Sequence, residues 1–297
     1  MAIKNWLSAF RLRTLPLALS CIGMGGFLAA AADKFDALIF FLCCLTTIFL
    51  QVLSNVANDY GDSVNGADHA ARKGPMRAVQ SGAISSAQMK NAVIIFVLLS
   101  LISGISLLLV SFGWNIKALS VFFGLGILSI LAAIAYTVGK KPYGYSGLGD
   151  ISVLLFGLVG VMGSVYLFTE NIFWMDVLPA LSCGFFSIAV LNINNIRDIE
   201  SDRTAGKFSI PVRIGKQKAS YYHWFLLIAG ISCSLIYVLL NFRSAAQFIF
   251  LLTLPLLLIN GKAVNSKPSE ELDPYLKQMA LSTLLFVILF GTGLMLS

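Results

Sequence analysis

The sequence predicts an all-α protein, a multi-pass integral membrane bundle of about nine transmembrane helices. Its composition and the length of its apolar runs predict this class. Hydrophobic residues make up 58% of the 297 residues and charged residues only 12%. Soluble domains have about 45–50% apolar and about 25% charged residues, so this chain has too little polar sequence to cover a soluble core. The apolar residues also form runs of roughly 20, which matches the hydrocarbon thickness of a bilayer.

Hydropathy predicts the spans in order along the chain, most of them joined by short links. The predicted spans cover residues 14–32, 38–57, 91–112, 117–137, 150–168, 174–194, 221–240, 246–262 and 279–296. Two polar connections are long, near 58–90 and 195–220. No separate soluble region remains, so residues 1–297 are predicted to form a single transmembrane domain.

Glycines recur along one predicted span, 150–168. Gly157, Gly160 and Gly163 are three residues apart. Small residues at this spacing let helices approach closely in a membrane, so we expect this stripe to be architectural.

Lysines and arginines are distributed unequally between the two sides of the predicted bundle. All but three of the 21 lie at the N-terminus or in the links after spans two, four, six and eight. The opposite side has only Lys34, Lys117 and Arg243. The positive-inside rule therefore places both long polar segments on the cytoplasmic side of the cytoplasmic (inner) membrane. Orientation, anionic headgroups and an anionic substrate explain the net charge, and a nucleic-acid partner is not needed.

A first polar cluster follows the second predicted span directly. It contains Asn58, Asp59, Asp62 and, beyond Gly66, Asp68. If the helix continues for two turns past its apolar part, Asn58 and Asp62 lie on one face, because residues four apart are neighbours on a helix.

A second cluster follows the sixth span with matching spacing. Asn194, Asp198 and Asp202 recur every four residues. Matching clusters at matching helix ends, on the same predicted side, indicate an internal duplication separated by four spans. Either cluster alone is equally typical of solvated loop acids, so the pairing makes the functional interpretation specific.

The stacked carboxylates favour a divalent metal. Acids four residues apart on a helix repel one another, and near lipid the repulsion is stronger. Mg²⁺ prefers oxygen ligands and is commonly bound by one or two carboxylates together with substrate phosphate oxygens. The two clusters therefore predict a site for Mg²⁺ and a diphosphate substrate.

Basic residues near the clusters are candidates for binding phosphate. Arg77 and the pair Lys140 and Lys141 are the stronger candidates, because Gly and Pro shape the loops around them. The alternative is that these residues serve only as orientation charges. The other basic candidates are Arg72, Lys73 and Arg203.

A third element lies between the fourth and fifth spans, from Tyr136 to Asp150. Tyr136, Tyr143 and Tyr145 are candidates to line a substrate pocket, since aromatic faces stabilise nearby positive charge. Asp150 is either a substrate-binding acid or, as we slightly prefer, an acid at a helix N-terminus favoured by the helix dipole.

The two motifs, Asn58-Asp59-x-x-Asp62 and Asn194-x-x-x-Asp198-x-x-x-Asp202, resemble those of the UbiA superfamily of intramembrane aromatic prenyltransferases. The resemblance covers nearly the whole chain. Longer strings, Gly74-Pro-Met-Arg77-Ala-Val-Gln-Ser-Gly82 and Pro142-Tyr-Gly-Tyr-Ser-Gly-Leu-Gly-Asp150, are similar to the branch that prenylates 1,4-dihydroxy-2-naphthoate in menaquinone synthesis.

The resemblance implies a Mg²⁺-dependent enzyme that transfers a polyprenyl group from its diphosphate to this aromatic acid, with decarboxylation. It implies that Asp62, Asp198 and Asp202 bind the metal, with Asp59 and Asp68 close by, and that Asn58 and Asn194 position the ligands. One departure affects Asp68: the family usually has an acid four residues after Asp62, where this chain has Gly66.

Other functions remain open at this point. Another acceptor, 4-hydroxybenzoate or homogentisate, is compatible with the motifs. An ion-coupled secondary transporter would have its acids and helix breaks near the midpoints of the spans, whereas these acids lie at the ends. A CDP-alcohol phosphotransferase would concentrate its acids in one segment.

Overall fold

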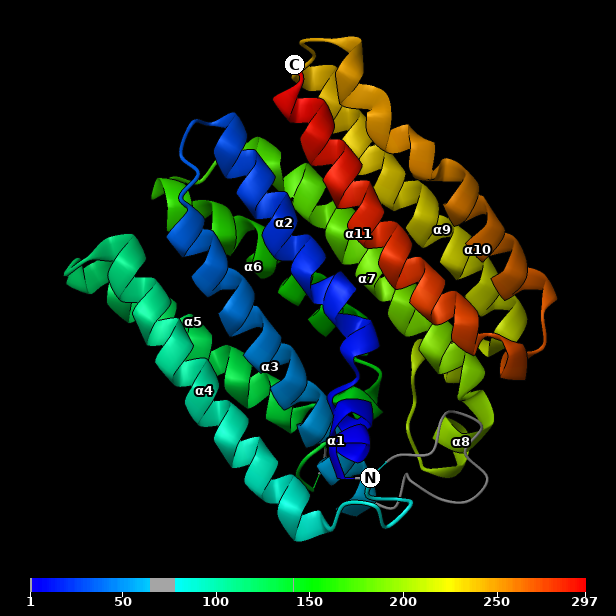
Figure 1. Ribbon diagram of the computed structural model, residues 1–297. Coiled ribbons are helices and arrows are strands. Elements are labelled where there is room, and N and C mark those ends of the chain that lie inside the picture. The colour runs from blue at the N-terminus through cyan, green and yellow to red at the C-terminus, as the bar shows by residue number, and fades with distance from the viewer. Residues whose placement is uncertain (1, 65–77, 141) are drawn as a thin grey trace.

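The fold is a bundle of helices, shown in Figure 1 as a computed structural model that describes residues 2–64, 78–140 and 142–297. The α-helices are α1 (Ala2–Phe10), α2 (Leu15–Ala31), α3 (Ala37–Val64), α4 (Ser86–Phe112), α5 (Ile116–Ala135), α6 (Gly149–Thr169), α7 (Val177–Arg197), α8 (Ile199–Thr204), α9 (Ile210–Leu240), α10 (Leu254–Ser266) and α11 (Asp273–Met295). Short 3₁₀ helices are η1 (Leu12–Thr14), η2 (Tyr143–Ser146), η3 (Trp174–Asp176), η4 (Ala245–Thr253) and η5 (Ser269–Glu271).

Within the described residues, nine helical segments are long and apolar enough to cross a membrane, and no strand is present. The prediction of an all-α membrane bundle is therefore confirmed. The first crossing joins α1, η1 and α2, and the eighth joins η4 to α10. Local signals set several helix starts: Ser85 and Gln88 form a capping box at α4, and Asn115 accepts a hydrogen bond from the Ala118 N–H at α5.

The two segments that the sequence marks as polar connections are partly helical. α3 continues to Val64, so the predicted extension of this helix past its apolar part is confirmed. The segment near 195–220 includes the end of α7, all of α8 and the start of α9. Hydropathy alone places these helix ends too early. The last turns contain polar residues that face the protein interior, and such residues extend a helix without raising its hydropathy.

One end of the bundle gathers the polar motifs, and we call it the acidic end. It holds the last turns of α3 and α7, together with α1, α8 and the N-terminus of the chain, as Figure 1 shows at the bottom of the view. The C-terminus lies at the opposite end, which we call the far end.

The main core lies between α2, α6, α7, α9 and α11. Four phenylalanine rings, Phe186, Phe250, Phe286 and Phe290, are fully buried there and contact one another in edge-to-face, tilted and stacked pairs. These helices pack tightly, because bundles in lipid depend on close van der Waals contact.

The glycine stripe of α6 is only partly architectural. A Cβ on Gly157 would lie 2.8 Å from Cα of Gly184 on α7, and one on Gly160 would lie 3.1 Å from Cβ of Cys21 on α2. Gly163 differs, since its Cβ would meet only Val159 of the same helix at 3.9 Å. The prediction of close packing is confirmed for the first two positions and is wrong for Gly163, which lines a cavity.

Candidate functional site

The last two turns of α3 bring the first motif into the interior of the acidic end. Asp59 and Asp62 are almost fully buried, with exposed fractions of 1% and 5%. Oδ1 of Asp59 forms an ion pair with Arg11, which precedes η1 and has a left-handed backbone conformation (φ 48°). Burial of a carboxylate is favourable only with such a partner, so α1 and η1 are held against α3 at this point.

Two residues from the α5–α6 connection reach α3. The Tyr145 hydroxyl donates a hydrogen bond to Oδ1 of Asp62 at 2.7 Å, and the Thr137 hydroxyl donates one to Oδ1 of Asn58 at 3.1 Å. Gly61 makes this approach possible, because a Cβ there would lie 2.7 Å from the backbone carbonyl of Thr137.

The second motif lies at the junction of α7 and α8. The helix breaks at Asp198 (φ −98°, ψ 11°), so Asn194, Asp198 and Asp202 are not on one continuous helix. The backbone still follows a helical path, because the Asp198 N–H bonds to the Asn194 carbonyl at 3.1 Å and the Asp202 N–H to the Asp198 carbonyl at 2.8 Å. The four-residue register that the sequence indicates is thus retained.

Arg197 is the central cation of this motif. It is 3% exposed, and its guanidinium donates to both carboxylate oxygens of Asp198, at 2.9 and 2.8 Å, and to Oδ1 of Asn194 at 2.8 Å. The two parallel bonds to Asp198 form the bidentate geometry that arginine provides and lysine does not.

The same guanidinium also bonds to Asp273, the first residue of α11. Asp273 accepts a further bond from Arg13 at 2.9 Å. A continuous chain of ion pairs therefore connects η1, α11 and α7, three elements that are far apart in sequence.

Asp202 on α8 is a buried acid with a lysine partner. It is 8% exposed, and the Lys207 ammonium lies 3.3 Å from its Oδ2. Burial raises the pKa of Asp202, the Lys207 charge lowers it, and the negative charges of Asp198 and Asp62 raise it again. Because the charges of Asp198 and Asp62 both act on Asp202, the two motifs lie near each other at the acidic end.

The carboxylates do not yet form a ligand set for a metal. Among the described residues, no three His, Cys, Asp or Glu side chains lie close enough together to hold an ion as they stand. The reason is that Asp59, Asp198 and Asp202 each have a cationic partner from the protein, and Asp62 has a tyrosine hydroxyl.

The other predicted residues lie at varied distances from these acids. Tyr136 packs edge-to-face against Tyr143, and the Tyr143 hydroxyl bonds to the Ala132 carbonyl at 2.9 Å and contacts Ser152 at 3.1 Å, away from Asp62. Asp150 lies in the first turn of α6, the placement that we preferred, and accepts a bond from Tyr222 at 2.8 Å.

Two predicted phosphate-binding residues are at the surface in this structure. Lys140 is exposed, and Arg203 is exposed and lies 3.5 Å from Glu200. The predicted residues Asp68, Arg72, Lys73, Arg77 and Lys141 lie outside the described residues.

The structure gives Tyr145 a contact that the sequence does not predict, and it adds Arg11, Arg13 and Asp273, which the sequence does not single out. Tyr143 and Tyr145 lie in the same sequence segment, and the 3₁₀ turn of η2 determines that the Tyr145 hydroxyl contacts Asp62. Arg11, Arg13 and Asp273 belong to no recognisable sequence motif. The two arginines are equally typical of charges that only orient the protein in the membrane.

A model of the UbiA prenyltransferase family matches residues 18–295. The chain belongs to the UbiA prenyltransferase family. Among the curated relatives of this family, 1,4-dihydroxy-2-naphthoate octaprenyltransferase of Haemophilus influenzae is 47% identical over 99% of this chain and 96% of its own length. The Escherichia coli protein of the same description is 44% identical over the same shares.

Solved structures of UbiA proteins have the same fold. A UbiA homolog from Archaeoglobus fulgidus bound to GPP and Mg²⁺ matches 99% of this chain and 100% of its own, with a TM-score of 0.68 and 18% sequence identity. The UbiA homolog from Aeropyrum pernix K1 in its apo form has a TM-score of 0.66 at the same identity. At 18% sequence identity, the similarity to these structures concerns the fold alone. The family membership of the chain rests on the match of its sequence to the family model.

Proposed function

We propose that this protein transfers a polyprenyl group from a polyprenyl diphosphate to 1,4-dihydroxy-2-naphthoate, giving demethylmenaquinol, diphosphate and carbon dioxide. The observation that carries the proposal is the 47% identity, over nearly the whole of both chains, to a relative described by this activity. The structure supports the proposal, because two buried Asn/Asp motifs lie near each other at one end of an apolar bundle, as a donor with a charged head and an apolar tail requires.

We propose Mg²⁺ as the metal, held by Asp62, Asp198 and Asp202, with Asp59 and Asp68 nearby. The donor set fits a hard cation, because it consists of carboxylate and amide oxygens. Oδ1 of Asn195 is buried and accepts no hydrogen bond from the described residues, whereas Oδ2 of Asp202 has the Lys207 ammonium 3.3 Å away. When bound, the metal would neutralise charge that develops on the diphosphate leaving group.

The side chains of the protein would assist the same step. Once a metal and diphosphate occupy the acids, Arg197 and Lys207 are placed to turn from their carboxylates to the diphosphate oxygens, and Arg11 is placed to do the same beside Asp59. The bond between the first tail carbon and the diphosphate oxygen would then break, and diphosphate would leave. The electron-rich ring of the acceptor would form a bond to that carbon and lose its carboxylate as carbon dioxide, which restores the aromatic ring. Burial of these groups excludes water, which would otherwise hydrolyse the donor.

We also propose the placement in the cell. The acidic end would face the cytoplasm, with the protein in the cytoplasmic (inner) membrane, because all but three of the 21 lysines and arginines lie on that side. Both a water-soluble aromatic acid and diphosphate would exchange with the cytoplasm there.

The test uses purified protein, Mg²⁺, octaprenyl diphosphate and three aromatic acids: 1,4-dihydroxy-2-naphthoate, 4-hydroxybenzoate and homogentisate. We expect prenylated product and diphosphate with the naphthoate. Product with another acid alone would reassign the acceptor, and no diphosphate release under any condition would contradict the enzyme assignment.

Asp198→Asn tests the site itself. It should lower kcat/KM by more than about 100-fold, since it removes a charge that the metal requires. The matched control is Glu200→Gln, an exposed acid two residues away, which should retain full activity. Near-full activity of Asp198→Asn would show that the metal assignment is wrong.

A further inference from the structure

The link between α8 and α9, residues 205–209, contacts two different parts of the acidic end. Lys207 approaches Asp202 twice: its backbone N–H bonds to the Asp202 carbonyl at 2.8 Å, and its ammonium lies 3.3 Å from Oδ2 of the same residue. The next residue, Phe208, contacts the α5–α6 connection instead, because its N–H bonds to the Tyr145 carbonyl at 2.9 Å. Two neighbouring residues of one link therefore touch the second motif and η2.

Arg213, near the start of α9, strengthens the contact between this link and η2. Its guanidinium donates from Nε to the Phe208 carbonyl at 3.0 Å and from Nη2 to the Ser146 carbonyl at 2.8 Å. One side chain thus binds both segments at the same time, which a planar guanidinium with several donors can do. We call Arg213, Phe208 and the segment 145–147 the clamp.

Gly147 makes the close approach of the two segments possible. It has a positive φ of 79°, and a Cβ there would lie 2.5 Å from the Phe208 carbonyl oxygen and 2.9 Å from Nη2 of Arg213. Any other residue would strain the turn and also push the carbonyl and the guanidinium away. The turn after η2 is therefore shaped to fit the clamp.

The clamp fixes the backbone that carries the Tyr145 hydroxyl. The Tyr145 carbonyl is bonded to the link, and its N–H is bonded within the α5–α6 connection at 3.1 Å. From this backbone the side chain crosses to α3 and donates to Oδ1 of Asp62 at 2.7 Å. A path of direct contacts therefore runs from Asp62 through Tyr145 to the α8–α9 link and Asp202, so the two motifs are connected through the protein.

The alternative interpretation of Arg213 is that it serves only as an orientation charge, since it is exposed and lies on the predicted cytoplasmic side. An orientation charge needs no fixed contacts, whereas this guanidinium forms two. The helix dipole also disfavours a cation near the start of a helix. The two carbonyls that Arg213 contacts explain its position, and the net charge of the loop does not.

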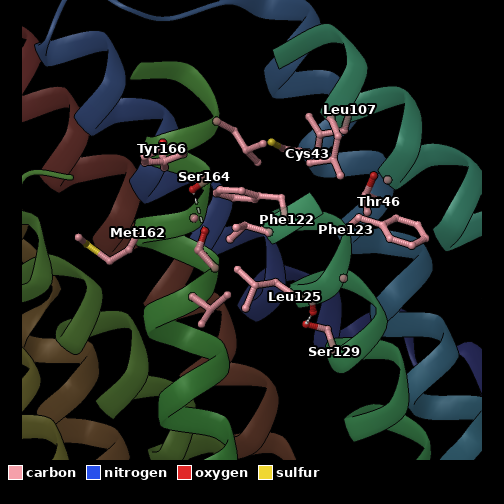
Figure 2. Close-up of a pocket in the computed structure, with 18 of the residues that line it drawn as sticks. Cys43, Thr46, Leu107, Phe122, Phe123, Leu125, Ser129, Met162, Ser164 and Tyr166 are labelled. Atoms are coloured by element: carbon pink, nitrogen blue, oxygen red, sulfur yellow. Dashed lines mark hydrogen bonds between the residues drawn. The ribbon is translucent and has the colours of Figure 1, made fainter. Parts of the chain in front are cut away.

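The clamp is separate from the apolar interior of the bundle. A cavity lies between α3, α4, α5 and α6, with Thr46, Phe122 and Met162 in its lining, as Figure 2 shows. In the part of the chain that the structure describes, no residue of the clamp lines this cavity. A change at Arg213 therefore alters the surroundings of Asp62 without altering contacts in the apolar space.

We propose that Arg213 is a positioning residue for prenyl transfer: it holds the backbone of Tyr145 and Ser146 against the α8–α9 link and so keeps the Tyr145 hydroxyl on Asp62. The inference rests on the proposed function, in which Asp62 is a ligand of the metal that binds the diphosphate. Arg213 acts through Tyr145 and needs no contact with substrate. Loss of either residue should weaken the same property, the affinity for Mg²⁺ together with diphosphate.

The first experiment measures binding without turnover. The Arg213→Met protein and the unmodified protein are unfolded by heat with inorganic diphosphate at one concentration and Mg²⁺ at several. Ligands that bind only the folded protein raise Tm according to their affinity. We expect Arg213→Met to need about tenfold more Mg²⁺ for the same rise in Tm, as is typical when a partner of a metal ligand is lost.

Lys216→Met is the matched control. Lys216 lies on α9 shortly after Arg213, and its ammonium also bonds to a backbone carbonyl of a neighbouring link, that of Lys267 at 2.6 Å. This link joins α10 to α11 and has no part in the clamp. The control removes a cation and a bond of the same kind, and its Mg²⁺ requirement should stay within about twofold of that of the unmodified protein, since separate sites act independently.

A pair of substitutions separates positioning from general support of the fold. The rate constant kcat/KM for prenyl transfer is measured for Arg213→Met, for Tyr145→Phe and for the protein with both changes. If Arg213 acts through the Tyr145 hydroxyl, the double variant should match Tyr145→Phe alone within about twofold. Losses that multiply would show that Arg213 acts by another route and would overturn the inference.

Gly147→Ala disturbs the clamp from its other side and should raise the Mg²⁺ requirement as Arg213→Met does. Its matched control is Gly113→Ala at the far end. Gly113 also has a positive φ (54°), but a Cβ there would meet nothing within 4 Å. Both variants carry the strain of alanine at positive φ, and only Gly147→Ala displaces the guanidinium of Arg213.

The outcomes distinguish this inference from the proposed function. If Arg213→Met and Gly147→Ala both keep the Mg²⁺ requirement of the unmodified protein, the positioning role is overturned and the function stands. Equal increases in Arg213→Met and Lys216→Met overturn it as well. If ligands cause no rise in Tm in the unmodified protein, both the metal assignment and this inference fail. If that protein binds the ligands but transfers no prenyl group to any of the three aromatic acids, the proposed function fails, and the Tm comparison still tests the clamp.

Discussion

At the scale of single residues, the acidic end is a set of carboxylates with partners from other elements. Arg11, Tyr145, Arg197 and Lys207 contact Asp59, Asp62, Asp198 and Asp202, respectively. Such outer partners orient metal ligands and commonly affect activity as strongly as some of the ligands themselves. Their contribution can be measured by removing one functional group at a time.

The two tyrosines of η2 give a direct test of this arrangement. Tyr145→Phe removes the hydroxyl that orients Asp62, so we expect kcat/KM to fall by about 10-fold or more. Tyr143→Phe is the matched control: its hydroxyl bonds to the Ala132 carbonyl, and its loss should cost about 1 kcal/mol of stability with little change in activity. Steady-state kinetics with a thermal unfolding curve distinguish the two, and a larger kinetic effect at Tyr143 would contradict the structure.

Lys207 should control the acidic limb of the pH profile. Burial raises the pKa of Asp202, so this carboxylate ionises at a higher pH than a free aspartate, and the Lys207 ammonium partly reverses the shift. In the metal site that we propose, Asp202 acts as an ionised ligand, so we expect activity to be lost as the pH falls through its pKa. Lys207→Met removes the cation and should move this limb of kcat/KM to higher pH.

The control for this experiment is Lys218→Met, which removes an exposed lysine at a distance from Asp202 in the sequence. It should leave the pH profile in place. A profile that is the same in Lys207→Met and the unmodified protein would show that Asp202 is not the group that titrates.

Sequence reasoning identifies the acids at this scale but not their partners. Asn58, Asp62, Asp198 and Asp202 recur at helical spacing after apolar runs, and this pattern is visible in one chain. The sequence does not show which of Tyr143 and Tyr145 contacts Asp62. The two lie two residues apart in a 3₁₀ turn whose direction depends on tertiary contacts.

At the scale of elements, hydropathy predicts the spans well and their ends poorly. The apolar cores of all nine spans agree with the structure, since lipid requires a continuous apolar helix. The extension of α3 to Val64, the break at Asp198 and the short α8 depend on polar contacts inside the acidic end. The same holds for Gly163, which shares a stripe with two packing glycines but faces a cavity.

Asp273 joins three elements and should be important for stability. It accepts hydrogen bonds from both Arg13 and Arg197, so it ties η1 and α7 to the start of α11. Asp273→Asn removes the negative charge beside a buried guanidinium, and we expect a loss of about 1–3 kcal/mol. Thermal unfolding in detergent measures it.

The control is Glu271→Gln two residues earlier. Glu271 pairs with Lys267 in an exposed i,i+4 bridge, and exposed bridges contribute about 0–1 kcal/mol. Equal effects of the two substitutions would mean that the chain of ion pairs through Asp273 does not hold these elements together.

At the scale of the whole molecule, the distribution of charge predicts one orientation. Lys34 lies in the exposed link between α2 and α3 at the far end, and Lys218 is exposed on α9 near the acidic end. We expect a cysteine at position 34 to react with an impermeant maleimide added outside spheroplasts, and a cysteine at position 218 to react only after the membrane is opened. The reverse pattern would show that the acidic end faces outward.

The ion pairs of the acidic end also affect the order in which ligands enter. A divalent ion that arrives alone must displace a tethered arginine or lysine from its carboxylate, and the displaced cation is then left near a second positive charge. A metal that arrives with diphosphate avoids this conflict, because the released side chains find new anionic oxygens at once. If these acids form the metal site that we propose, their ion pairs would disfavour a cation alone and favour the metal and the donor together.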